Sequence, residues 1–302
     1  MHPSPHGSPR PAAGAGGVGT RPRPFGGGGG GEGARPVIHD YHLHTHFSCD
    51  ADASVEAMCR AALARGLKEI AITDHVDFTP EDPCYRYFQA EKYWAATQRC
   101  RGKFEGALVV RVGVEIGEPH LYPAEIRSLL AAHEYDFVLG SLHWADGRPL
   151  FRSSFFDGLG LDGGIALYFE ELARLAEEGE YDVLAHMDIV RRAAYRRYGL
   201  RELDLRPHEA RVRRVLRVVA ERGKGIEVNA AYVRKGIGDP GPSVQVLRWF
   251  REEGGRIVTL GSDAHRPEDV GRGLDRALEM VREAGFGRIA MFERRRVRWL
   301  NL

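Results

Sequence analysis

Cysteine is scarce in this chain, and it has neither a long apolar run nor an excess of charge of one sign. The 302 residues include four cysteines, at positions 49, 59, 84 and 100, and carry a formal net charge of +1. With no C-x-x-C pair and no small disulfide-rich scaffold, we expect reduced thiols. The near-zero charge argues against a nucleic-acid surface. No apolar run approaches the ~20 residues of a membrane span.

Large apolar side chains are almost missing from residues 1–35, which are mainly Gly, Pro, Ala and Arg. Such a segment cannot bury enough surface to offset its ordering entropy, so we expect a disordered tail. Within it, Gly14-x-Gly16-x-x-Gly19 matches a dinucleotide fingerprint, but no strand precedes it and no amphipathic helix follows. Since the tail also lacks the apolar stretch of a secretory signal, we expect a cytoplasmic protein with one folded domain, residues 36–302.

The rest of the chain alternates short apolar strands with helices. The strand-like runs are 37–41, 69–73, 108–114, 137–140, 182–185, 226–228 and 257–260. Helical periodicity covers 54–66, 88–104, 124–133, 167–179, 207–223, 243–254 and 274–285. This alternation is typical of a parallel sheet with right-handed crossovers, and seven units predict a closed or nearly closed α/β barrel. Residues 289–299 are a candidate for one further strand.

Each of the seven runs ends in, or is followed by, a side chain that can bind a metal ion or an anionic ligand. In chain order these side chains are His42, His44, Asp74, His75, Glu115, Ser141, His143, His186, Asn229, Asp263 and His265. The carboxyl ends of barrel strands meet at one face, where α/β barrels place their chemistry. A single His after a strand is more often a core residue, but a polar residue at all seven ends predicts a site.

The residue types at these ends favour a site with several metal ions. His42 and His44 are two apart in extended chain, so their imidazoles lie on the same face, and Asp50 follows in a turn. The imidazoles and carboxylates exceed the roughly four ligands of one zinc ion, so we expect two or three ions. Mixed nitrogen and oxygen ligands without thiolate suit Zn²⁺, Fe²⁺ or Mn²⁺. Asp74 is expected to orient His75 or a neighbour.

In this order, the residues resemble the PHP (polymerase and histidinol phosphatase) family over about residues 38–270. The motifs that carry the resemblance are Asp40-Tyr-His42-Leu-His44-Thr, Ser48-Cys-Asp50, Thr73-Asp-His75, Gly113-Val-Glu115, Gly140-Ser-Leu-His143, Ala185-His186 and Gly261-Ser-Asp263-Ala-His265. The resemblance implies a distorted (β/α)7 barrel and a trinuclear site. It assigns His42, His44, Glu115 and Asp263 to the first ion, Glu115, His143 and His186 to the second, and Asp50, His75 and His265 to the third.

Two further motifs resemble the stand-alone histidinol-phosphate phosphatases within that family. They are Glu227-Val-Asn229-x-x-x-x-Arg234-Lys235 and His186-Met-Asp188-x-x-Arg191-Arg192. In such enzymes, arginines near these places hold the substrate phosphate, which suits the planar guanidinium. The resemblance therefore gives Arg234 this role, together with either Arg191 or Arg192, of which Arg192 is favoured.

The resemblance implies a histidinol-phosphatase of histidine biosynthesis, with Glu115, Asp263 and His265 in catalytic roles and a small phosphate monoester as the partner. Bound ions would lower the pKa of water from ~15.7 towards ~7 and neutralise phosphate charge. One alternative is a PHP-type nuclease or nucleotide phosphoesterase, against which the near-neutral charge argues. Another is a non-catalytic, metal-stabilised module, against which the intact ligand set argues. The sequence does not decide whether His265 or a metal-bound water protonates the leaving alkoxide, and it does not specify the oligomeric state.

Overall fold

The computed structural model describes residues 39–302, and the strands expected from the sequence form one parallel sheet there. Their bounds are β1 His39–Leu43, β2 Glu69–Ile72, β3 His75–Val76, β4 Val109–Gly117, β5 Phe137–Ser141, β8 Val183–Leu184, β9 Gly225–Asn229 and β10 Ile257–Gly261. The order across the sheet is β1-β2-β4-β5-β8-β9-β10, and β3 pairs with β4. A parallel bridge joins Leu43 to Ala264, just beyond β10. The predicted, nearly closed barrel is thereby confirmed.

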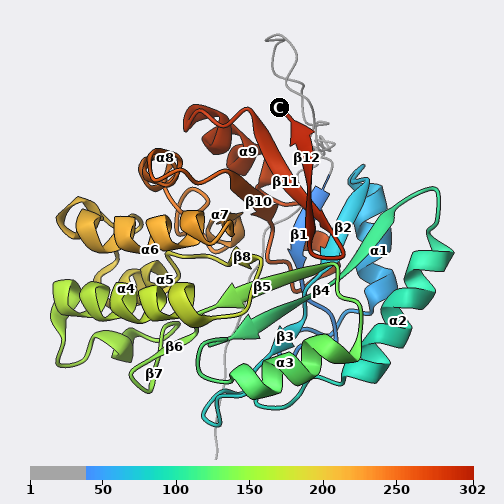
Figure 1. Ribbon diagram of the computed structural model, residues 1–302, viewed down its shortest axis with the longest axis horizontal. Coiled ribbons are helices and arrows are strands. Elements are labelled where there is room, and N and C mark those ends of the chain that lie inside the picture. Colours follow the sequence, from blue (N-terminus) through green and yellow to red (C-terminus); the bar gives the residue numbers. More distant parts are fainter. Residues whose placement is uncertain (1–38) are drawn as a thin grey trace, which may run out of the picture. The chain divides into compact units, whose positions relative to one another are not determined.

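Helices pack around this sheet, as the apolar periodicity predicts. Their bounds are α1 Val55–Ala64, α2 Ala90–Lys103, α3 Pro123–Ala132, α4 Gly160–Glu178, α5 Val190–Tyr198, α6 Glu209–Glu221, α7 Ala231–Arg234, α8 Val244–Glu252 and α9 Leu274–Glu283, with short 3-10 turns η1 Ser153–Phe156, η2 Arg206–His208 and η3 Pro267–Asp269. In Figure 1, α4 and α6 lie on one flank of the barrel, and α1 and α2 on the other. Two helices, α5 and α7, were not expected from the sequence and follow β8 and β9 closely.

The last segment forms a hairpin and not an eighth barrel strand. β11 (Arg288–Glu293) pairs antiparallel with β12 (Arg296–Asn301) in a separate two-stranded sheet. The Phe292 ring packs 4.8 Å from that of Phe137 at the start of β5. The backbone N–H of Arg294 donates to Asp136, also at the start of β5. The hairpin therefore covers the amino ends of the strands, away from the ligand-type side chains. A second small hairpin, β6 (Trp144–Ala145) and β7 (Arg148–Pro149), follows β5.

The expected tail of residues 1–35, with its glycine-rich fingerprint, lies outside the described residues. Of the helices in the part of the chain that is described, none combines the length and apolar character needed to cross a membrane.

The expectation of reduced thiols is wrong for two of the four cysteines. Cys49 and Cys84 form a disulfide, with their Cα atoms 5.2 Å apart, whereas Cys59 and Cys100 are free and buried. The pair has no local sequence signature because its members are 35 residues apart. The barrel brings the turn after β1 against the loop between β3 and α2, and the disulfide ties these two loops together.

Reduction of this disulfide should lower the free energy of unfolding by roughly 2–4 kcal/mol, because the bond restricts the unfolded chain. We expect the midpoint of denaturant-induced unfolding of the wild-type protein to shift to a lower denaturant concentration when reductant is added. A Cys49→Ser/Cys84→Ser double variant should show the lower stability with or without reductant. Titration of four free thiols in protein unfolded without reductant would contradict the disulfide.

Candidate metal centre

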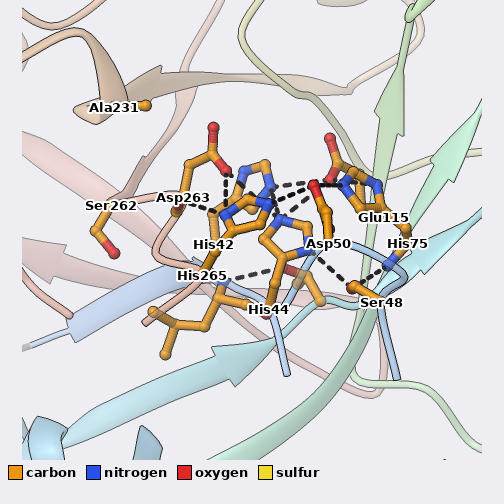
Figure 2. A network of polar contacts seen from close by, with 12 residues as sticks. His42, His44, Ser48, Asp50, His75, Glu115, Ala231, Ser262, Asp263 and His265 are labelled. Carbon is orange, nitrogen blue, oxygen red and sulfur yellow. Dashed lines mark hydrogen bonds and ion pairs between the residues drawn. The ribbon is translucent and has the colours of Figure 1, made fainter. Parts of the chain in front are cut away.

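The nine side chains that the sequence singled out as metal ligands gather around Glu115 at the carboxyl ends of the strands. They come from β1, β3, β4 and the loops after β1, β5, β8 and β10. Figure 2 shows the imidazoles of His42, His44 and His265 between Asp263 on one side and Glu115 and His75 on the other. A cavity of about 240 Å³ opens over this group.

The Glu115 carboxylate is buried and surrounded by imidazoles. Its Oε2 lies 3.1 Å from His42 Nε2 and 3.1 Å from His75 Nδ1. Its Oε1 lies 2.8 Å from His186 Nε2 and 3.5 Å from His143 Nε2. Each oxygen therefore faces a different set of nitrogens, which is the arrangement that a bridging carboxylate requires.

The remaining ligand-type side chains form two groups on either side of His44. His44 Nε2 lies 3.0 Å from His42 Nε2 and 3.6 Å from Asp263 Oδ1. On the outer side, Asp50 Oδ2 lies 3.0 Å from His265 Nε2 and 3.9 Å from His75 Nε2. With the residues around Glu115, these groups bring the nine side chains into one cluster, and their division among three ions stays a prediction.

The charges in this group are strongly coupled. Burial alone would raise the pKa of Glu115, but the neighbouring His42 and His75 hold it well below its usual range. The pKa of Asp263 is likewise well below its usual range, since Arg192 and His42 outweigh the effect of burial. Burial lowers the pKa of His44 well below its ordinary value, and His265 adds to this. Two ionised carboxylates beside a neutral imidazole are ready to accept cations.

Behind His42 lies a second carboxylate, that of Glu227 on β9. Glu227 Oε1 lies 2.7 Å from His42 Nδ1, and Oε2 accepts from the backbone N–H of His186 at 2.8 Å. An acceptor at Nδ1 fixes the tautomer that leaves the Nε2 lone pair facing Glu115. The approach requires glycine at position 261, because a Cβ there would overlap with Glu227 Oε1. This explains the glycine in the motif Gly261-Ser-Asp263.

Asp74 plays a similar part for His44, through a serine. The Ser48 hydroxyl donates to Asp74 Oδ1 at 2.6 Å and lies 3.1 Å from His44 Nδ1. Asp74 also accepts from the backbone N–H and the hydroxyl of Thr45. Asp74 therefore holds the turn after β1 and acts on a neighbour of His75, one of the two roles expected from the sequence.

His186 and Asp263 have positive φ angles, of 23° and 54°, which are unfavourable for residues with a Cβ. The backbone at Asp263 is held by Arg234, whose guanidinium donates to the carbonyls of Ser262 at 3.0 Å and of Asp263 at 2.8 Å. Arg234 Nε also lies 3.4 Å from Asp269. Arg234 is not among the residues that line the cavity, so this geometry does not match the phosphate contact expected of it.

The two arginines of α5 point in different directions. Arg192 lines the cavity and donates through Nη2 to Asp263 Oδ2 at 2.6 Å. Arg191 turns away and donates to the carbonyls of Arg201 and Asp239. The structure thus places Arg192, and not Arg191, beside the site. Lys235, for which no role was expected from the sequence, also lines the cavity.

These donor atoms fit divalent transition-metal ions. Several sets of three, including His42, His44 and Asp263, have ligand atoms that all lie within 4.8 Å of one another. The sets contain nitrogen and oxygen but no thiolate among the nine residues. Six imidazoles and three carboxylates packed at these distances suit Zn²⁺, Fe²⁺ or Mn²⁺ better than Mg²⁺ or Ca²⁺, which prefer oxygen ligands.

Comparison with known proteins agrees with the fold. The model of the PHP domain matches residues 40–231. A probable histidinol-phosphatase of Clostridium acetobutylicum is 28% identical over 87% of this chain and 100% of its own length. The histidinol-phosphatase of Lactococcus lactis is 24% identical over 84% of this chain and 93% of its own length.

Among solved structures, a histidinol phosphate phosphatase of Lactococcus lactis, in complex with zinc, L-histidinol and phosphate, superposes with a TM-score of 0.76. It is 22% identical and the match covers 86% of this chain and 98% of that one. At 22% sequence identity, this match establishes the fold alone.

Proposed function

The chain belongs to the PHP domain family, since the family model covers more than half of it, and we propose that it is a histidinol-phosphatase. The proposed reaction is hydrolysis of L-histidinol phosphate to L-histidinol and phosphate, a step of histidine biosynthesis. The observation that carries the proposal is the buried carboxylate of Glu115 with imidazoles facing both of its oxygens, beneath a cavity with cations on its wall. The relatives with that activity align over most of this chain.

In this proposal three ions share the nine side chains. His42, His44, Glu115 and Asp263 would hold the first ion, Glu115, His143 and His186 the second, and Asp50, His75 and His265 the third. Zinc, which is present in the Lactococcus lactis structure, is our first choice of metal, ahead of iron or manganese. When bound, such ions supply a water of lowered pKa as the nucleophile and neutralise charge on the phosphate. In this proposal Glu115, Asp263 and His265 contribute to catalysis by binding the ions.

Arg192 and Lys235 are the side chains that we assign to the substrate phosphate. Arg192 Nη2 is engaged with Asp263, but no hydrogen bond within residues 39–302 uses its Nη1. Lys235 lines the same cavity, and the neighbouring Arg192 charge, together with burial, lowers its pKa to about 8. A phosphate dianion would be attracted by both cations, and it would favour the charged form of Lys235. Arg234 holds the turn that carries Asp263 and acts as a positioning residue.

Part of the cavity lining is apolar. Ile189, Phe151 and Pro83 contribute to it. A cavity of about 240 Å³ accommodates a small monoester and not a nucleic-acid strand, which argues against the nuclease alternative. We propose the cytoplasm as the compartment, because a phosphorylated biosynthetic intermediate is made and consumed without crossing a membrane.

The proposal is tested by phosphate release from a panel of monoesters, including L-histidinol phosphate, nucleoside monophosphates and a short oligonucleotide. We expect the highest kcat/KM with L-histidinol phosphate. A preference for nucleotides or oligonucleotides would replace this function with that of a nucleotide phosphoesterase or a nuclease, and no turnover of any ester would favour a non-catalytic module.

Glu227→Gln should weaken metal binding by roughly 10- to 100-fold, as is usual when a carboxylate behind a metal-bound imidazole is lost. The amide can no longer act as a charged acceptor for His42 Nδ1. Competition with a chromophoric chelator measures the affinity directly, and Glu221→Gln, at an exposed position on α6, is the matched control. Unchanged affinity in Glu227→Gln would show that Glu227 only supports the fold.

A further inference from the structure

The cavity over the metal centre has opposite charges on its two sides. Arg192 and Lys235 lie on the side formed by the segments after β8 and β9. Asp82 lies on the other side, in the loop between β3 and α2. A substrate with a phosphate at one end and a cation at the other would match this distribution.

Asp82 differs from the other carboxylates that line the cavity. Asp50, Glu115 and Asp263 each lie close to imidazole or guanidinium nitrogens, and Asp77 lies 3.7 Å from His143 Nδ1. In the described part of the chain, no Lys, Arg or His nitrogen lies within 4.0 Å of the Asp82 carboxylate. Its charge is therefore not neutralised by the protein.

The position of Asp82 is nevertheless fixed, by neutral donors. Its Oδ2 accepts from the indole N–H of Trp144 at 2.7 Å, and its Oδ1 accepts from the backbone N–H of Cys84 at 2.7 Å. The disulfide between Cys84 and Cys49 anchors the same loop. A carboxylate that is 8% exposed, held by neutral groups and facing a cavity is arranged to meet a cation supplied from outside.

We propose that Asp82 is a specificity-determining residue that binds the nitrogen-bearing end of the substrate, namely the ammonium group of an amino-alcohol phosphate. This inference rests on the proposed function and adds to it the means by which the enzyme distinguishes an aminated monoester from a simple one. The phosphate lies towards Arg192 and Lys235, and the ammonium lies towards Asp82. Phe151, which lines the same cavity, offers an apolar surface for the rest of the substrate.

The test is Asp82→Asn, assayed on L-histidinol phosphate and on phenyl phosphate, which has no cationic group. Asparagine keeps one oxygen, which can accept from either Trp144 or Cys84, and it removes the charge. We expect kcat/KM for L-histidinol phosphate to fall by roughly 10- to 150-fold, the range for losing a charge-assisted contact, with phenyl phosphate hydrolysis unchanged. Inhibition by the product L-histidinol should weaken in parallel.

Glu81→Gln is the matched control, because it removes an exposed charge from the same loop and leaves Asp82 and its hydrogen bonds in place. Any effect of that change should fall equally on the two substrates. An equal fall on both substrates in Asp82→Asn, or no fall on either, would overturn the role of Asp82 while leaving the phosphatase function standing. A wild-type enzyme with no preference for L-histidinol phosphate over phenyl phosphate would instead overturn the proposed function and this inference with it.

Discussion

Replacement of Glu115 by Gln is expected to abolish phosphate release, with a loss in kcat on the order of 10³-fold or more. Removing a single charge-stabilising contact from an active site costs roughly 10²–10³-fold. Glu115 serves more than one contact, because its two oxygens face His42 and His75 on one side and His143 and His186 on the other. An amide offers one neutral oxygen in place of two charged ones, so two proposed ions lose a ligand together.

The measurement should combine the rate of phosphate release with the metal content per chain. Glu178→Gln, at an exposed position on α4, is the matched control and should retain both values. We expect Glu115→Gln to fold and to bind fewer ions than the wild-type protein. A Glu115→Gln enzyme with wild-type kcat would remove Glu115 from the site.

Replacement of Arg192 by Met is expected to lower kcat/KM for L-histidinol phosphate by roughly 10- to 150-fold, the equivalent of one charge-assisted contact of ~1.5–3 kcal/mol. Arg192 lines the cavity, whereas the Arg234 guanidinium is engaged with the backbone carbonyls of Ser262 and Asp263. Arg234→Met should therefore act through Asp263 and reduce metal affinity. The two variants are distinguished by measuring KM and metal content in each.

Arg127→Met, on the exposed side of α3, is the control for loss of a surface arginine. If Arg192→Met retained wild-type kinetics while Arg234→Met raised KM with full metal content, the phosphate contact would belong to Arg234. The assignment made from the sequence would then be restored in place of the one made from the structure.

The barrel and the proposed ligand set could be predicted from the sequence because both depend on local pattern. A parallel strand that is buried on both faces is an uninterrupted apolar run, and its end is marked by the first polar residue. At β8 the first polar residue after the apolar run, His186, lies at the site, whereas Glu115 lies within β4 and Asp263 comes one residue after Ser262. Because such runs are repeatedly followed by His, Asp or Glu, the residues at the common face of the barrel can be predicted without the structure.

The features that the sequence did not reveal depend on the direction of single side chains. Arg191 and Arg192 are neighbours on α5, so their side chains point about 100° apart, and only the packing of α5 decides which one faces the cavity. The same holds for Arg234 and Lys235 at the end of α7. Both helices are short, and tertiary packing, not intrinsic propensity, determines such helices.

Contacts between segments that are far apart in the sequence could not be predicted either. The Cys49–Cys84 disulfide joins two loops that carry no cysteine motif, and its residues become neighbours only when the barrel forms. The contact between Glu227 and His42 spans 185 residues and depends on the space left by Gly261. A glycine in a motif indicates that something approaches closely, but the sequence does not say what.

The central claim, that this chain is a metal-dependent phosphatase of L-histidinol phosphate, is tested most directly by titrating a divalent metal into chelated protein while phosphate release is measured. The account predicts no turnover in the metal-free protein and full turnover once two or three ions are bound per chain. Chelated protein with less than one transition-metal ion per chain that still hydrolyses L-histidinol phosphate at the full rate would contradict it.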